Sequence, residues 1–313
     1  MEIIKKGTKI YKYSSVEDFI RNADDNTIVL SRPSLFNDPF DSNISIDEKE
    51  INETIKIVDE FGIFLKILQI KNLPDVFMNV LNNFKIEVID SGYFKSSNAL
   101  NTICERIQES CCDLLKQENA KFRNKTIDNL FDLKNKILVS CFSLKNDSLL
   151  MWAHYADSHK GVCIEYESSI DDLFYKVNYQ ESIEHFKLYD LSTRIMAKML
   201  QSNNVQFEND WLIQNYGKPF ITKSLEWKYE DEVRCLFYEP LIQSKYPNIK
   251  DKEGKNIEGK YLYNVPSRIT KVILGCKIEQ EDRNRIIKKC DLLGIPIEEM
   301  KTSDNQYKLE IKN

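Results

Sequence analysis

Two glutamates, Glu230 and Glu232, stand one residue apart in a run rich in aromatic and charged residues, 226–237. If this run is a strand, alternate side chains face opposite sides of it, so Glu230, Glu232 and Arg234 share one face. Val233 then belongs to the face that packs into the core. Two carboxylates fixed beside a buried surface can stabilise a positive charge that develops in a transition state. The alternative is an edge strand on which Glu232 and Arg234 are solvated.

A second group of reactive side chains lies on a predicted helix, 148–157. One face of this helix is expected to pack into the core, through Leu149, Trp152, Ala153 and Ala156. The opposite face carries groups that hydrogen-bond or stack: Met151, His154, Tyr155 and Ser158. His154 is therefore a candidate for ligand binding, and a purely structural histidine is the alternative. His159 follows five positions later, where it does not share a helix face with His154, so a metal pair is not expected.

The segment 31–41 contains Pro33 and Pro39, so it is predicted to be a structured loop. Asp38 and Asp41 stand on either side of Pro39, where aspartate side chains commonly cap turns. Carboxylates are also preferred ligands of magnesium and manganese. These two aspartates, together with the two glutamates, leave open a metal-dependent nuclease or phosphohydrolase.

The elements that would position these residues form a strand-rich pattern with helical interruptions. Alternating and β-branched runs predict strands at 9–13, 27–30, 137–143, 162–166, 233–238, 272–275 and 307–311. Helical periods predict helices at 16–23, 148–157, 192–214 and 279–293. Helical insertions are expected at about 47–136 and 171–220. We therefore expect a single α+β domain over residues 1–313, interrupted by these two insertions.

Composition excludes several classes of protein. The 313 residues carry 44 basic and 49 acidic side chains, a net charge of -5, so no global attraction to nucleic acid or an anionic membrane is expected. No apolar run approaches the ~18 residues that a membrane-spanning helix needs. The eight cysteines contain no C-x-x-C pair and are interpreted as reduced core thiols. With no recognisable secretory signal at the N-terminus, a cytoplasmic protein is expected.

Several motifs together resemble the bacterial family catalogued as domain of unknown function 2971. They are Tyr11-Lys12-Tyr13, the loop 36–41, Cys141-Phe142-Ser143, the helix 151–156, the segment 159–163 and the segment 227–234. The resemblance spans nearly the whole chain, and the helical insertions are its least constrained parts. This family name implies no activity.

The order of the elements is similar, more distantly, to the split β-sheet of ADP-ribosyltransferases. Those enzymes carry a polar residue, often His or Arg, on the first strand and a Ser or Tyr on the next. A later strand opens with a glutamate, often as E-x-E or Q-x-E. The resemblance implies an enzyme that cleaves the nicotinamide–ribose bond of NAD and transfers ADP-ribose to a macromolecule or to water, as a toxin or a defence effector would. The first strand of this chain carries neither His nor Arg.

The resemblance also implies roles for individual residues, position by position. Tyr11 or Tyr13 would contact the nicotinamide or the ribose of NAD. Ser143 and Tyr155 would line the nicotinamide side of the site. No metal is implied, and nucleic acid enters only as a substrate.

The same resemblance implies a different role for each of the two glutamates, Glu230 and Glu232. Glu232 corresponds to the catalytic glutamate, which binds a ribose hydroxyl and stabilises an oxocarbenium-like transition state. Glu230 corresponds to the residue that directs the acceptor. Besides the metal-dependent enzyme, a third class stays open: a catalytically silent binding module in which the helix around Trp152 and Tyr155, together with Trp227, serves only the core.

Overall fold

The computed structural model describes residues 1–23, 27–42, 45–69, 75–95, 102, 113–168, 174–183, 185–201, 209–242, 248–250, 256–264 and 267–312. The chain divides into two compact units. The first contains Met1–Asn43, Lys136–Ile183 and Leu212–Asn313, and the second contains Ile44–Asn135 and Glu184–Trp211. The two segments of the second unit lie within the predicted insertions, at about 47–136 and 171–220, except that the first segment begins at residue 44.

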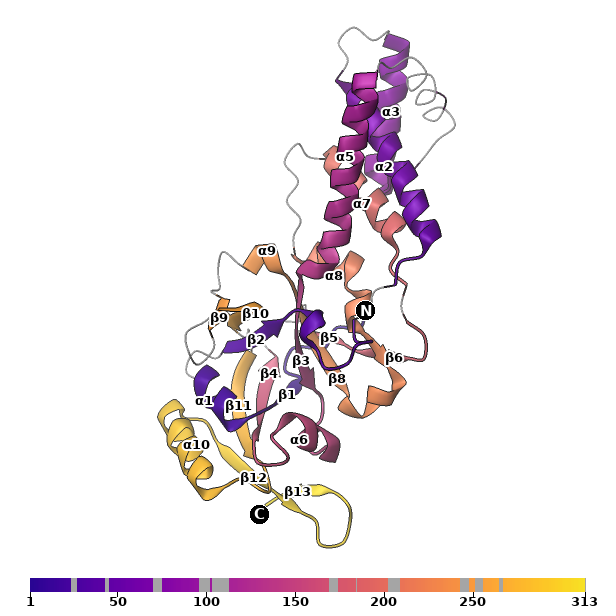
Figure 1. The fold of residues 1–313 in the computed structure, drawn as a ribbon. Coiled ribbons are helices and arrows are strands. Elements are labelled where there is room, and N and C mark those ends of the chain that lie inside the picture. The colour runs from indigo at the N-terminus through magenta and orange to yellow at the C-terminus, as the bar shows by residue number, and fades with distance from the viewer. Residues whose placement is uncertain are drawn as a thin grey trace. The chain divides into compact units, whose positions relative to one another are not determined.

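The first unit is built on a mixed, mostly antiparallel sheet (Figure 1). Its strands are β1 (Lys9–Ser14), β2 (Thr27–Ser31), β3 (Ile137–Ser143), β4 (Val162–Ser168), β5 (Phe174–Lys176), β8 (Glu232–Tyr238), β9 (Asn248–Lys250), β10 (Asn256–Asn264), β11 (Ser267–Leu274), β12 (Ile297–Thr302) and β13 (Leu309–Ile311). A separate parallel pair consists of β6 (Asn178–Gln180) and β7 (Thr222–Ser224). The helices are α1 (Val16–Asn22), α6 (Leu149–Tyr155), α9 (Glu239–Ile242) and α10 (Gln280–Leu293), with 3₁₀ turns η1 (Pro33–Leu35), η3 (Lys218–Ile221) and η4 (Leu225–Glu230). The α+β class predicted from the sequence is confirmed.

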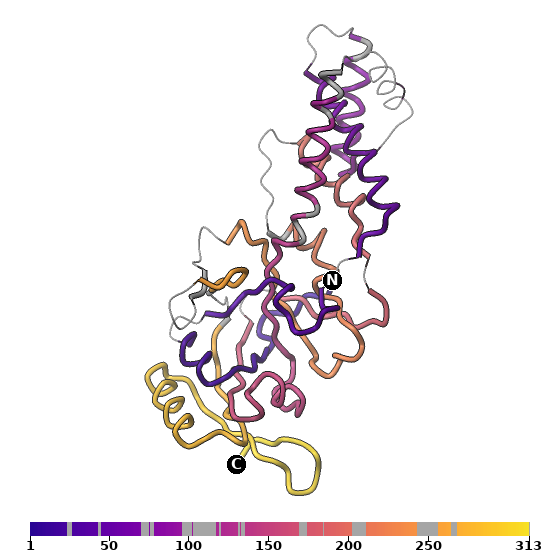
Figure 2. Tube along the Cα trace, in the orientation of Figure 1, coloured from indigo at the N-terminus to yellow at the C-terminus, as the bar shows by residue number. Residues whose placement is uncertain are grey.

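The strand order is β13-β12-β11-β4-β1-β3-β2-β10-β9, and β8 pairs with both β3 and β5. Figure 2 shows β1, from the start of the chain, lying beside strands from much later in it. β8 occupies one edge of β3 along its whole length. On the other edge, β3 meets β1 where Ser143 faces Tyr11 and meets β2 where Val139 faces Ser31. β1 and β2 therefore diverge, and the sheet opens between them.

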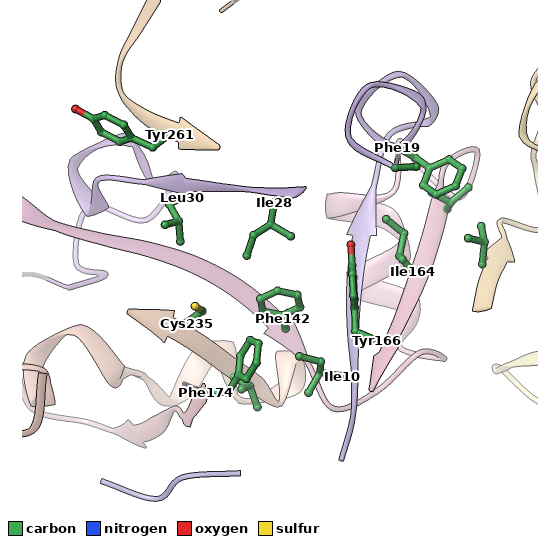
Figure 3. Close-up of a cluster of buried hydrophobic side chains, with 14 of the residues drawn as sticks. Ile10, Phe19, Ile28, Leu30, Phe142, Ile164, Tyr166, Phe174, Cys235 and Tyr261 are labelled. Carbon is green, nitrogen blue, oxygen red and sulfur yellow. The ribbon is translucent and has the colours of Figure 1, made fainter. Parts of the chain in front are cut away.

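The central strands are covered on both faces because alternate side chains point to opposite sides. One face packs against α1 and α10, through Ile10, Phe19, Ile164, Val272 and Ile286. Figure 3 shows Ile10, Phe19 and Ile164 in this cluster. The other face packs against α6, through Tyr11, Tyr13, Trp152, Cys163 and Ile273. Two serines begin the short helices as caps: Ser15 Oγ accepts a hydrogen bond from Asp18 N at 3.1 Å, and Ser148 Oγ accepts one from Met151 N at 3.4 Å.

The predicted buried stripe of α6 is partly wrong. Trp152 and Ala156 are fully buried, as predicted, but Leu149 is 39% exposed and Met151 is buried instead. The helix packs against both β1 and η4. Because two neighbours cover it, its buried surface is wider than one stripe and shifts towards Met151.

The second unit is helical. Its helices are α2 (Glu48–Leu68), α3 (Asp75–Ser91), α5 (Asp113–Leu133) and α7 (Leu188–Gln201), and α8 (Asn209–Tyr216) begins in this unit. Phe94 forms the centre of its core, with ring centroids 5.0 Å from Phe61, 5.7 Å from Phe64 and 5.8 Å from Phe84. Across the described residues, no helix combines the length and apolarity that a bilayer crossing needs.

Five of the eight cysteines lie in the described residues, and all five are free thiols. Cys163, Cys235 and Cys290 are buried, in agreement with the prediction, whereas Cys141 and Cys276 are partly exposed. Cys104, Cys111 and Cys112 lie outside the described residues.

Candidate active site

A cavity of about 260 Å³ lies at the opening between β1 and β2. Six of the residues that the sequence analysis expects to bind or act on NAD line it: Tyr11, Tyr13, Ser143, Tyr155, Glu230 and Glu232. Residues from distant parts of the chain complete its wall, among them Lys12, Asp41 and Lys223. We call it the carboxylate cavity, because three of its lining residues are acidic.

Glu230 and Glu232 reach this cavity from two different elements. The sequence predicted one strand through both residues, and this is wrong: Glu230 ends the 3₁₀ turn η4, and β8 begins only at Glu232. Asp231 between them has a φ of 45°, in the left-handed region, which lets the chain reverse there. Both carboxylates still lie together because this tight turn holds them against one lysine.

The alternative of an edge strand with solvated charges is also wrong. The middle of β8 is paired on both edges, by β3 and by β5. Glu232 is 3% exposed and Arg234 is completely buried. Charged side chains at such depth must be paired, because an isolated buried charge is very costly.

The ammonium group of Lys223, on β7, lies close to all three carboxylates that line the cavity. Its Nζ lies 2.5 Å from Glu230 Oε2, 3.2 Å from Glu232 Oε2 and 3.5 Å from Asp41 Oδ2. It also lies 4.7 Å from the centroid of the Trp227 ring. Burial opposes the charge on Lys223, but the surrounding carboxylates outweigh this effect and raise its pKa.

Arg234 holds Asp41 and Glu232 with two pairs of hydrogen bonds. Its Nη1 and Nη2 donate to Asp41 Oδ1 at 2.7 Å and Oδ2 at 2.6 Å. Its Nε and Nη2 donate to Glu232 Oε1 at 2.8 Å and Oε2 at 3.0 Å. Such two-point contacts fix the position of both carboxylates. Nη1 also donates to the Phe220 carbonyl at 2.8 Å and to Ser42 Oγ at 3.1 Å.

The ion pairs of this cluster join three acidic groups, Asp41, Glu230 and Glu232, to two basic groups, Lys223 and Arg234. Burial raises the pKa of the Glu230 carboxyl, and the charge of Glu232 raises it further. Burial also opposes the charge on Glu232, but Arg234 and Lys223 outweigh this effect and lower its pKa to about 2. Glu230 therefore holds a proton more readily than an ordinary glutamate, and Glu232 holds one less readily. Neighbouring carboxyls whose pKa values differ in this way are typical of acid–base sites.

Hydroxyl groups fix the glutamates from other sides. Tyr155 OH donates to Glu230 Oε1 at 2.8 Å, and Ser143 Oγ donates to the Glu230 carbonyl at 2.6 Å. Tyr179 OH accepts from the Glu232 backbone N–H at 2.8 Å. Ser143 also lies opposite Glu232 in the pairing of β3 with β8. These contacts leave little freedom for either glutamate to turn away from the cavity.

The tyrosines of β1 are held by bonds away from the glutamates. Tyr11 OH donates to Glu165 Oε2 at 3.2 Å, and burial raises its pKa. Tyr13 OH donates to the Lys145 carbonyl at 2.8 Å, and its ring meets that of Trp152 edge-on at 5.4 Å. Both hydroxyls are therefore already hydrogen-bonded within the protein.

His154 is not among the residues that line the carboxylate cavity. It is exposed, and its ring lies 6.2 Å from Tyr155 and 6.5 Å from Tyr229. Tyr229 in turn lies 5.9 Å from Trp227. These contacts join Trp227, Tyr229, His154 and Tyr155 in one series of rings, and the hydroxyl of Tyr155 binds Glu230.

Asp38 and Asp41 have different roles in the structure. Asp38 Oδ1 accepts a hydrogen bond from Phe40 N at 2.9 Å, which is the turn-capping role predicted for it. Asp41 instead binds Arg234 and lies near Lys223. In the part of the chain that the structure describes, no group of three or more His, Cys, Asp or Glu side chains is arranged to hold a metal ion.

Lys12 and Lys223 are site residues that the sequence interpretation missed. Nothing in the local pattern distinguishes them from surface lysines, and Lys223 approaches Asp41 only through the fold. Arg234 was considered only as a member of the strand that carries Glu232. One feature of the sequence does point to the role of Arg234. A charged residue between Val233 and Cys235, in a largely apolar run, indicates a buried partner of opposite charge.

Residues 151–235 match the family described as Protein of unknown function (DUF2971). This supports the resemblance to that family over part of the chain. The matched DUF2971 stretch runs from α6 into β8 and includes Tyr155, Lys223, Glu230, Glu232 and Arg234, so most of the charged cluster lies within it. Comparisons with curated proteins and with solved structures found no match.

Proposed function

We propose that this chain is an ADP-ribosyltransferase-like enzyme that cleaves the nicotinamide–ribose bond of NAD and transfers ADP-ribose to a macromolecule or to water. The observation that supports this most directly is the pair of carboxyls at the wall of one cavity, Glu230 with a raised pKa and Glu232 with a pKa lowered to about 2. Cleavage of a glycosidic bond uses two carboxyl groups whose protonation states differ in this way.

In the proposed reaction Glu232 stays ionised. As the bond to nicotinamide breaks, positive charge develops on the ribose, and a fixed carboxylate beside it lowers the free energy of the transition state. Arg234 holds Glu232 in place before the reaction, so no reorganisation is needed when the charge appears. Glu232 would also accept a hydrogen bond from a ribose hydroxyl.

Glu230 acts on the acceptor in this proposal. Its raised pKa suits a group that accepts a proton from a hydroxyl, an amine or water as the acceptor attacks the ribose. Lys223 and Tyr155 bind its two carboxylate oxygens, and their bonds keep it pointing at the same space as Glu232. The proton leaves the acceptor for Glu230 while the new bond to ribose forms.

The wall of the cavity fits the reacting half of NAD. At about 260 Å³ the carboxylate cavity is slightly smaller than the ~300–1,000 Å³ found for ligand pockets. It is therefore sized for the nicotinamide and its ribose, not for the entire dinucleotide. Tyr11, Tyr13 and Ser143 line the same cavity as the two glutamates. In this proposal the tyrosines contact the nicotinamide or the ribose, and Ser143 lies on the nicotinamide side.

The decisive experiment incubates the pure chain with NAD labelled in its adenylate half, in the presence of cell extract. Free nicotinamide and labelled macromolecules would support a transferase, and free nicotinamide with labelled ADP-ribose would support a hydrolase. A folded chain that neither binds NAD nor releases nicotinamide would contradict the proposal and favour a silent binding module. Repeating the assay with a chelator separates this reaction from that of a metal-dependent enzyme.

A further inference from the structure

A second cavity, of about 290 Å³, adjoins the carboxylate cavity. Both are lined by Lys12, Tyr13, Val29 and Tyr155. The second cavity extends towards α1 and has an apolar floor that includes Phe19, Ile28 and Tyr166, three side chains of the core cluster in Figure 3. We call it the lysine cavity, after Lys12 and Lys260 in its lining.

The two cavities differ in charge. The carboxylate cavity is lined by three acidic residues, Asp41, Glu230 and Glu232, and by Lys12 and Lys223. The lysine cavity is lined by three basic residues, Lys12, Arg21 and Lys260, and by one acidic residue, Asp18, which pairs with Arg21. One cavity therefore favours a cationic group and the other an anionic group.

Lys12 stands between them, at the opening of the sheet. Its Nζ donates to Ser140 Oγ at 3.0 Å and to the Cys141 carbonyl at 2.9 Å, and it lies 5.0 Å from the centroid of the Phe142 ring. All three partners are neutral, and among the described residues this ammonium group forms no salt bridge. A lysine has three N–H donors, so one is left for a ligand. Burial lowers the pKa of Lys12 because its charged form is less stable away from water. A bound anion would offset this cost.

We infer that the lysine cavity binds the phosphate-bearing half of a nucleotide, with Lys12, Arg21 and Lys260 around the phosphates and the base on the apolar floor. This inference rests on the proposed function in one respect: the ligand would span both cavities. The positively charged nicotinamide ring of NAD then lies in the acidic cavity, and its diphosphate lies at Lys12, where the cavities meet. A nucleoside diphosphate such as ADP should occupy the lysine cavity by itself.

Equilibrium binding of ADP, measured by calorimetry on the full chain at low and moderate salt, tests this inference. We expect one saturable site that weakens as salt is added. Lys260→Gln and Arg21→Gln, at the partly exposed rim, should each weaken binding at least several-fold, and Lys12→Met by tenfold or more, because charge-assisted bonds to phosphate are lost. Lys288→Gln on α10 removes the same charge from an exposed site that lines neither cavity, and it should bind ADP like the wild type.

The outcomes separate this inference from the proposed function. ADP binding that depends on Lys12 and Lys260 supports the nucleotide site even if no NAD is cleaved. Equal ADP affinity in the wild type, Lys260→Gln and Arg21→Gln overturns it even if NAD is cleaved, and so does the absence of ADP binding. If Lys12→Met proves unfolded by circular dichroism, the two rim variants carry the test.

Discussion

Asp41 and Arg234 are 193 residues apart in the chain, yet two hydrogen bonds of 2.7 and 2.6 Å join them inside the first unit. Asp41 lies in the loop that follows β2, and Arg234 lies in the middle of β8. Their contact connects the loop at the mouth of the carboxylate cavity to the strand that carries Glu232. The ion pair therefore supports both the fold and the position of the candidate catalytic residue.

Arg234→Gln should destabilise the first unit strongly. The substitution leaves Asp41 and Glu232 without their guanidinium partner in a buried site, and breaking a buried ion pair from one side costs about 3–5 kcal/mol. Urea unfolding followed by tryptophan fluorescence measures this loss, since Trp152 and Trp227 both lie in the first unit. Arg285→Gln makes the same change at an exposed ion pair with Glu17 and should leave the midpoint almost unchanged. Equal midpoints for the two variants would show that the cluster contributes nothing to stability.

The two aspartates of the loop should respond differently to the same substitution. Asp41→Asn removes a charge from the buried cluster and should cost about 3 kcal/mol. Asp38→Asn keeps an oxygen that can accept from Phe40 N, so its effect should stay below about 1 kcal/mol. Thermal unfolding of the two variants tests the order. A larger loss for Asp38→Asn would mean that the loop depends on its own turn more than on Arg234.

Trp152→Ala should lower stability before it affects chemistry. Trp152 is completely buried, packs edge-on against Tyr13 and donates to the Asn146 carbonyl at 2.7 Å. Truncating such a side chain costs about 3–5 kcal/mol. Leu149→Ala on the same helix, at a 39% exposed position, should change stability by less than about 0.5 kcal/mol. Because the tryptophan is itself a fluorescence probe, circular dichroism in urea is the appropriate measurement, and similar losses in both variants would contradict the burial pattern of α6.

The stability of the first unit should fall as the pH falls from about 4.5 towards 2. Glu232 has a pKa of about 2 in the folded state, against 4.5 for an ordinary glutamate, so its contribution is complete above pH 4.5 and is lost as the carboxylate takes up a proton. The difference corresponds to about 3 kcal/mol. Glu230 acts in the opposite sense, because its pKa is raised: its contribution is present at low pH and decreases as the pH rises through that pKa.

Two matched variants separate these contributions. Glu232→Gln should show a shallower loss of unfolding free energy between pH 4.5 and 2 than the wild type. Glu230→Gln stays neutral at every pH, so its stability relative to the wild type should improve as the pH rises above about 4.5. Urea midpoints at four pH values are sufficient. Parallel pH profiles for all three proteins would show that neither carboxyl has the assigned pKa shift.

Assays of nicotinamide release and of macromolecular labelling should distinguish the roles of Glu230 and Glu232. Glu232→Gln removes the charge that meets the developing oxocarbenium ion, so NAD should still bind while nicotinamide release falls by at least ~10². Glu230→Gln should suppress labelling of a macromolecule more than release of free ADP-ribose, because it acts on the acceptor. Circular dichroism must show both variants folded. Full activity in folded Glu232→Gln would rule out Glu232 as the catalytic residue.

Much of the local structure follows from the sequence because it depends on neighbouring residues. A largely apolar run gives β3 its bounds at Ile137–Ser143, and a serine before a helical period gives the starts of α1 and α6. The spacing of Glu230 and Glu232 identifies the pair. Six of the seven residues expected to bind or act on NAD, all except His154, line one cavity, because the strand order brings β1, β3 and β8 together.

Only the tertiary structure decides which charges meet. The sequence does not mark Lys223 as a site residue, and it marks Asp41 as a turn cap or a metal ligand rather than as a partner of Lys223 and Arg234. Ion pairs across such separations are set by the packing of strands and not by local period. The same reason explains the errors. β8 is paired on both edges by strands distant in the chain, so Arg234 is buried rather than solvated, and α6 has two packing partners, so Met151 rather than Leu149 faces the core.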